Sequence, residues 1–181
     1  MFRKIFTAAL LSLALSAPAF ADDANLQLFK AAQKQVLGYP QFSIFDAVHM
    51  EIVDNGVIEL TGKVTMPYKR DAIEKRVAKA DGVRQVINKI EVLPVSQFDD
   101  SLRFRIARAI YGNANFWGYG SMANPPIHII VEGGKVTLDG VVNSNVDRML
   151  ARSIASSFTS FGPVKNQLKT DAEAKAELEK L

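Results

Sequence analysis

The fold of this chain is decided by a stretch that occurs twice: Ile52–Val64, which reads IVDNGVIELTGKV, and Ile130–Val142, which reads IVEGGKVTLDGVV. The two copies lie 78 positions apart, and the same offset aligns Asn88 with Asn166. A repeat of this length that includes its own turns indicates a duplicated domain. We therefore expect two small units of similar fold, an arrangement that usually binds or bridges a partner.

Each copy has the pattern of a β-hairpin. Hydrophobic and polar residues alternate before the turn, and Asn55-Gly56 or Gly133-Gly134 supplies residues that adopt positive φ. Gly62 and Gly140 fall inside the return strand, where a glycine suggests a bulge or the close approach of another backbone.

Helical patterns flank each hairpin, and a last strand closes each unit. In the second unit the helix is expected to begin at Asp100 or Ser101, with arginines mostly off its apolar face. The strand–helix–strand end implies a right-handed crossover. The predicted fold class is therefore α+β, with two tandem αββαβ domains, each a small mixed sheet with two helices packed on one face.

The predicted boundaries follow from composition. Residues 1–21 resemble a secretory signal peptide, with Arg3 and Lys4 before an apolar stretch and a small-x-small site ending at Ala21. We expect the first domain at 22–93, a proline-containing linker at 94–98, the second domain at 99–170, and a short helix or disordered tail at 171–181. Because each unit is small, a further hypothesis is that the two stabilise one another.

Cysteine is absent from the sequence, which excludes disulfides, zinc–thiolate sites and acylation of an N-terminal cysteine. Removal of Arg3 and Lys4 with the signal segment lowers the net charge from +3 to about +1. This is too little for a strongly basic nucleic-acid footprint, so no nucleic-acid partner is expected. The predicted location is the periplasm, reached through a cleaved signal peptide and without a lipid anchor.

The repeated residues resemble the motif of the BON domain. The motif positions in the two copies are Gly56, Leu60, Gly62, Val64, Asn88, Gly134, Leu138, Gly140, Val142 and Asn166. Two such domains behind a signal peptide resemble the OsmY-type periplasmic family. This resemblance implies a role in envelope or osmotic stress and binding to phospholipid surfaces or hydrophobic ligands.

No constellation of residues indicates catalysis. His49 and His128 are expected on strand surfaces and have no metal-ligand spacing, and Asp54 and Asp139 fit as turn residues. No nucleophile, base and orienting group can be nominated together. We therefore predict that the protein is not an enzyme and holds no cofactor or metal.

The best candidate for binding is an aromatic segment of the second unit. It contains Phe116, Trp117 and Tyr119 and follows the helix that carries Arg103, Arg105 and Arg108. Amphipathic aromatics favour the membrane interface, and arginines near an anionic surface each contribute about 1 kcal/mol. The alternative is that the aromatics pack inside the protein, and the aromatic segment 39–45 of the first unit favours that alternative.

The sequence thus predicts a non-catalytic protein that binds anionic phospholipid surfaces, mainly through its second domain. The alternative is a periplasmic chaperone or an adaptor for envelope proteins. Raised ionic strength separates the two, because it weakens binding by arginines but not binding of apolar clients.

Overall fold

The repeated stretch forms the same antiparallel hairpin in both halves of the chain. The computed structural model describes residues 19–159 and 161–180, so nearly all of the predicted signal segment at 1–21 lies outside the described residues. In the first hairpin β1 (Ala47–Asp54) pairs with β2 (Val57–Val64). In the second, β5 (Ile127–Glu132) pairs with β6 (Lys135–Val142).

The two strand glycines allow a close approach of backbones. Gly62 has a φ of +115° and Gly140 a φ of +116°, a backbone region that residues with a side chain rarely adopt. A Cβ atom at Gly62 would overlap the carbonyl oxygen of Ala47 at the start of β1, and one at Gly140 would overlap that of Pro126 just before β5. The close approach predicted from the two glycines is therefore confirmed.

The last strand of each unit is split into two short pieces. All four pieces run parallel to the central strand of their sheet, β2 or β6. They are β3 (Gln85–Asn88), β4 (Glu91–Val92), β7 (Lys165–Asn166) and β8 (Lys169–Thr170). The predicted continuous strands are therefore corrected to interrupted ones.

The motif asparagines explain the interruption. The side-chain oxygen of Asn88 accepts from the backbone N–H two residues later at 3.1 Å, and Asn166 does the same at 3.3 Å. Their side-chain NH₂ groups donate to the helix carbonyls of Arg70 at 3.3 Å and Arg148 at 3.0 Å. Each asparagine therefore turns the chain between the two short strands and ties them to the covering helix.

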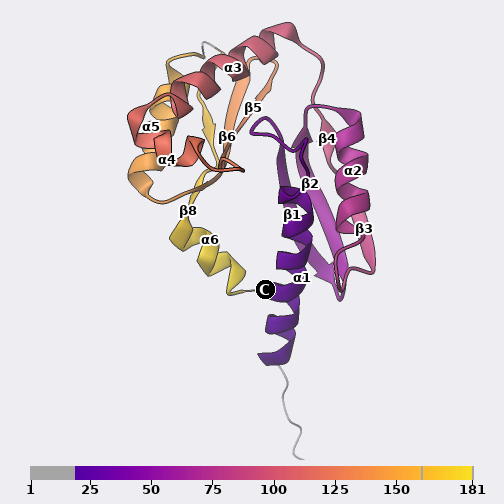
Figure 1. Ribbon diagram of the computed structural model, residues 1–181. Helices are drawn as coiled ribbons and strands as arrows, with labels where there is room; N and C mark the ends of the chain where they lie inside the picture. Colours follow the sequence, from indigo (N-terminus) through magenta and orange to yellow (C-terminus); the bar gives the residue numbers. More distant parts are fainter. Residues whose placement is uncertain (1–18, 160, 181) are drawn as a thin grey trace, which may run out of the picture.

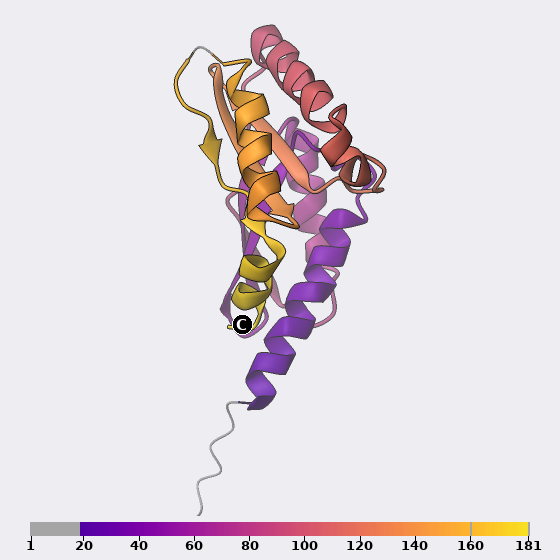
Figure 2. The ribbon, with the colours of Figure 1, turned by 90° about the vertical axis from the view of Figure 1, so that its left-hand side faces the viewer.

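Two helices cover one face of each sheet (Figures 1 and 2). The first sheet packs against α1 (Ala19–Leu37) and α2 (Pro67–Val77), and the second against α3 (Gln97–Tyr111) and α5 (Asn145–Ser156). A last helix, α6 (Asp171–Leu178), has no buried residue. The predicted α+β fold of two αββαβ domains is confirmed. No helix among the described residues combines the length and apolarity needed to cross a membrane.

The helix α3 begins earlier than predicted. Its N-cap is Ser96, whose hydroxyl accepts from the backbone N–H of Asp99 at 3.2 Å, and not Asp100 or Ser101. The Asp99 carboxylate, which is buried, instead accepts from the turn amides of Gly133 at 2.9 Å and Gly134 at 2.8 Å. The helix therefore starts within the predicted linker at 94–98.

The two units are joined along their edge strands β1 and β5. The backbone N–H of Ile129 donates to the carbonyl of Ile44 at 2.7 Å, and Lys63 forms an ion pair with Glu132 at 2.6 Å. A small buried cluster of Ala47, Leu93 and Ile130 lies between the units. The repeats therefore have a built interface rather than a flexible connection.

The histidines and Asp139 lie at this interface, which corrects two predictions. Asp139 is a buried residue of β6, not a turn residue, and its carboxylate bonds to His49 Nε2 at 2.8 Å. His128 is not a surface histidine, since its ring lies 5.4 Å from that of Phe42 in the other unit. Burial lowers the pKa of His128, whereas the hydrogen bond to Asp139 raises the pKa of His49.

Candidate functional site

The exposed face of α3 carries aromatic and basic side chains together. Leu102, Ile106 and Ile110 point into the core of the second unit. On the opposite face Phe104 is 60% exposed, and Arg105 and Arg108 are also exposed. Of the described acidic residues, none forms an ion pair with either arginine. The helix therefore presents two arginines that form no ion pair with a described residue, beside an exposed ring.

Arg103 does not belong to this surface. It is only 4% exposed, and its guanidinium donates to the carbonyl of Val131 at 3.0 Å and pairs with Asp100 at 3.0 Å. Its position on the helix lies close to that of Ile106 and Ile110, so the prediction that it lies off the apolar face is wrong. The arginine fastens α3 to β5 and is unavailable to a ligand on the surface.

Two of the three predicted aromatic residues are anchors of the loop that follows α3. This loop forms a short 3₁₀ turn at Ala114–Phe116 and a single helical turn, α4 (Trp117–Gly120). Phe116 is fully buried and Tyr119 is 5% exposed, and their rings lie 5.8 Å apart. For these two residues the expectation of a packed position holds, and they are not part of an exposed surface.

The hydroxyl of Tyr119 fixes α4 to the start of α5. It donates to Asp147 Oδ2 at 2.9 Å and accepts from the backbone N–H of Asn143 at 2.8 Å. Desolvation by burial is the main cause that raises the pKa of this hydroxyl, so it remains a donor across neutral pH. Buried Phe116 before the helical turn and the bonded hydroxyl of Tyr119 within it therefore anchor the loop.

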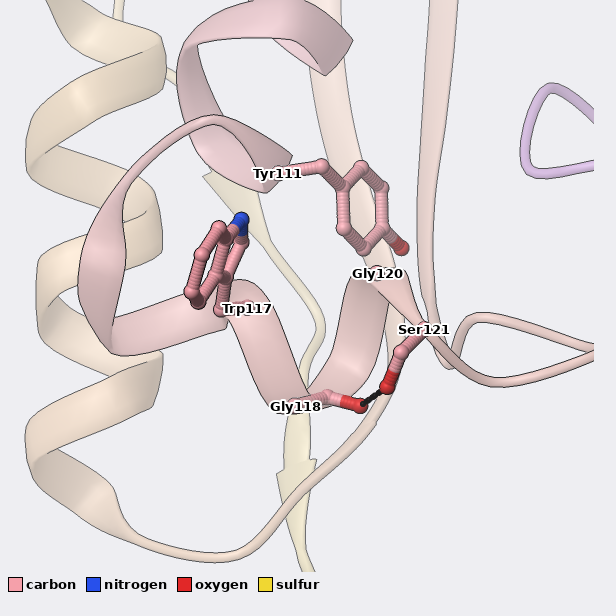
Figure 3. A pocket seen from close by; sticks show the side chains of 5 residues that line it. All are labelled: Tyr111, Trp117, Gly118, Gly120 and Ser121. Atoms are coloured by element: carbon pink, nitrogen blue, oxygen red, sulfur yellow. Dashed lines mark hydrogen bonds between the residues drawn. The ribbon is translucent and has the colours of Figure 1, made fainter.

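Trp117 lies between these two anchors and points outward. It is 78% exposed, although the residue before it is fully buried. Figure 3 shows its indole beside the ring of Tyr111. Together with Gly118, Gly120 and Ser121 these two residues line an open pocket of about 550 Å³. Tyr111 is itself fixed, because its hydroxyl donates to the carbonyl of Ile127 at 2.6 Å. Trp117 is therefore a large amphipathic side chain presented by a rigid frame.

A second, smaller pocket lies further along α3. It has a volume of about 280 Å³, and its walls are apolar side chains with the two exposed arginines among them. The lining residues are Phe104, Arg105, Arg108, Ala109 and Phe158. The guanidinium of Arg105 lies 5.4 Å above the ring of Phe158. This distance is typical of a cation–π contact, which holds the arginine in place.

Three aromatic residues at or behind the second pocket were not identified from the sequence. They are Phe104 and Phe158, which line it, and Phe45, which packs against Phe104. Phe104 could have been found, because an aromatic residue on the polar face of an amphipathic helix has no core to enter. Phe45 of the first unit packs edge-on against Phe104 at 4.8 Å between ring centroids. That contact depends on how the two units dock, which no local pattern reveals. Within the described residues, no group of three or more potential metal ligands is present.

The first unit lacks this arrangement. Its corresponding segment places Phe42 and Phe45 against the second unit, where they contact His128 and Phe104. The segment ends at Asp46, a fully buried carboxylate paired with Lys69 at 2.7 Å. Phe42 and Phe45 of the first repeat therefore serve the interface, whereas Phe104 and Trp117 of the second repeat are exposed.

Comparison with known proteins identifies the family. No curated protein matches the chain. Two solved structures of CdsD, a structural protein of the type III secretion system of Chlamydia trachomatis, are similar at 13% and 14% identity. The first alignment covers 83% of this chain and 67% of the CdsD chain, with a TM-score of 0.33. The second covers 84% of this chain and 97% of the CdsD chain, with a TM-score of 0.29. These scores are too low to transfer any property.

The family model gives a clearer result. The model of the BON domain matches residues 46–94 and again residues 99–172, which together are more than half of the chain. BON domains are associated with phospholipid binding and with osmotic-stress proteins, and proteins that contain them are generally non-catalytic. The chain therefore belongs to the BON-domain family and carries two copies of the domain in tandem.

Proposed function

We propose that this protein binds reversibly to anionic phospholipid surfaces through the exposed side of α3 and α4 in its second BON domain. The observation that carries the proposal is the exposure of Trp117, at 78%, between two buried aromatic anchors. An exposed tryptophan that does not pack in the core of its domain matches the requirements of a lipid interface. The rigid frame reduces the conformational entropy lost on binding.

The charge distribution supports the same surface. Arg105 and Arg108 are exposed on α3, and each adds about 1 kcal/mol beside an anionic membrane. Phe104, at 60% exposure, supplies apolar area between them and the first unit. A few aromatics and arginines without an acyl chain give weak, reversible attachment. We further propose an exported, periplasmic location, on the basis of the basic and apolar N-terminal residues alone.

The test is co-sedimentation of the protein with anionic and neutral vesicles. Burial of a large apolar side chain contributes about 1.5–3 kcal/mol, so Trp117→Ala should weaken binding to anionic vesicles roughly tenfold or more. Its stability should remain within about 0.5 kcal/mol of the wild type, since an exposed side chain is removed. Tyr68→Ala is the matched control, because Tyr68 is an exposed aromatic, at 51%, in the first unit. Equal vesicle binding by the Trp117 variant and this control would contradict the proposal.

A protein-binding role is the second candidate, and one observation favours it. Val146 is 73% exposed and Met149 is 65% exposed on the same face of α5. Apolar side chains exposed together are typical of contacts with other proteins. An adaptor or chaperone acting through α5 would bind apolar clients with little dependence on salt, whereas lipid binding through the arginines weakens as salt is added. Met149→Glu should abolish binding of apolar clients and leave binding of anionic vesicles intact.

A further inference from the structure

The small groove between α3 and the end of α5 has the composition of a site for one ligand. Its walls are Phe104, Ala109 and Phe158, and its only charged side chains are Arg105 and Arg108. At about 280 Å³ the groove is slightly smaller than the sites of drug-sized ligands, which span about 300–1,000 Å³. Its size therefore suits a headgroup and the first carbons attached to it, not a whole lipid.

The two arginines are placed to act on the same anion. Arg105 and Arg108 are three residues apart in a helix, so their side chains are neighbours on one face. The nearby carboxylate of Asp100 is already paired with Arg103, at 3.0 Å. The Arg105 guanidinium carbon lies 5.4 Å from the ring centroid of Phe158, a cation–π contact that uses none of the N–H donors of the guanidinium in a hydrogen bond. Two arginine forks without a partner are suited to bidentate recognition of phosphate.

The first repeat supports one wall of the groove from behind. The ring of Phe45 packs edge-on against Phe104, 4.8 Å from centroid to centroid. Phe45 is part of the segment whose backbone bonds to β5, because the carbonyl of Ile44 accepts from Ile129 at 2.7 Å. Docking of the two units therefore holds Phe104 in position over the groove, which gives the neutral first repeat a role in the site of the second.

We propose that this groove binds the phosphate group of a single anionic phospholipid, with Arg105 and Arg108 on the phosphate and Phe104 and Phe158 on the adjoining carbons. The inference rests on the proposed function and sharpens it, since a discrete site differs from a diffuse attraction between arginines and a charged membrane. A diffuse attraction depends only on charge, and lysine satisfies it as well as arginine. A site built from planar guanidinium forks does not tolerate that exchange.

The experiment is a calorimetric or NMR titration with short-chain phosphatidic acid kept below its micelle concentration. The wild type should bind it saturably at one site and should not bind short-chain phosphatidylcholine. Arg108→Lys should weaken binding roughly tenfold, the effect of one lost hydrogen bond to a charged group. The matched control is Arg152→Lys, an exposed arginine on α5 that does not line the groove. Inorganic phosphate should bind more weakly than the lipid, because it lacks the apolar contacts.

The outcomes separate this inference from the proposed function. If the double variant Arg105→Lys/Arg108→Lys binds the short-chain lipid as tightly as the wild type, the discrete site is refuted. This holds even if the double variant still binds vesicles. Inorganic phosphate that binds as tightly as the lipid would refute the phospholipid assignment. If the short-chain lipid binds at the groove but vesicles are not bound, the site stands and the proposed membrane function fails.

Discussion

Tyr119→Phe tests whether one hydroxyl group fixes the segment that presents Trp117. The change keeps the buried ring and removes the donor to Asp147, at 2.9 Å, and the acceptor for the Asn143 amide, at 2.8 Å. Loss of a hydrogen bond to a charged group costs about 1.5–3 kcal/mol, and the unpaired groups are partly reached by water. We therefore expect the free energy of unfolding to fall by about 2 kcal/mol.

The assay is urea unfolding followed by circular dichroism. With a typical urea slope of about 2 kcal/mol per molar, the midpoint should fall by about 1 M. Hydrogen exchange at the Asn143 amide should speed up by roughly thirtyfold, because about 1.4 kcal/mol corresponds to a factor of ten. Tyr68→Phe is the control. Because Tyr68 is 51% exposed, this variant should unfold at the same urea concentration as the wild type. A Tyr119→Phe variant with unchanged midpoint and exchange would refute the account of how α4 is held.

Three further outcomes are expected. Gly140→Ala should destabilise the protein by about 2 kcal/mol or more, whereas Gly133→Ala, whose Cβ would meet open space, should cost only about 1 kcal/mol, as measured by urea unfolding. The hydrogen bond to Asp139 raises the pKa of His49. The contribution of this pair to the free energy of unfolding is therefore fully present below the unfolded-state pKa near 6.5, and it is lost as the pH rises through the pKa of the folded state. The stability difference between wild type and His49→Gln should therefore be larger at pH 5.5 than at pH 8.5, and an equal difference would contradict the pairing. Asp99→Ala should cost about 2–4 kcal/mol in urea unfolding, because the backbone amides of Gly133 and Gly134 lose a buried carboxylate acceptor, and an unchanged midpoint would contradict this role of Asp99.

The fold could be predicted because its determinants are local and occur twice. The turn glycines, the strand glycines Gly62 and Gly140 and the motif asparagines each impose a backbone geometry that few other residues permit. The start of α3 was misplaced for a physical reason. Ser96 and Asp99 both fit a helix N-terminus, and only the position of the second hairpin turn shows that Asp99 serves that turn instead.

The candidate site could be predicted only in part. Trp117, Arg105 and Arg108 are exposed, whereas Arg103, Phe116 and Tyr119 are buried. A loop aromatic gives no sign of which direction it faces, because that depends on partners distant in the sequence. The Tyr119 hydroxyl is held by donating to Asp147 and by accepting from the backbone N–H of Asn143. Asp139 lies within β6 and pairs with His49 of the other repeat. Contacts of this kind follow from tertiary packing and leave no periodic pattern.

If Trp117 enters a lipid surface, its own fluorescence will report the change in its surroundings. Trp117 is the single tryptophan of the sequence, so the emission of the protein reports this position alone. In buffer its emission should be that of an indole in water, since it is 78% exposed. Anionic vesicles should shift the emission to shorter wavelength, and added salt should reverse the shift, while neutral vesicles should cause little change. Emission that stays unshifted at a large excess of anionic vesicles would contradict the account.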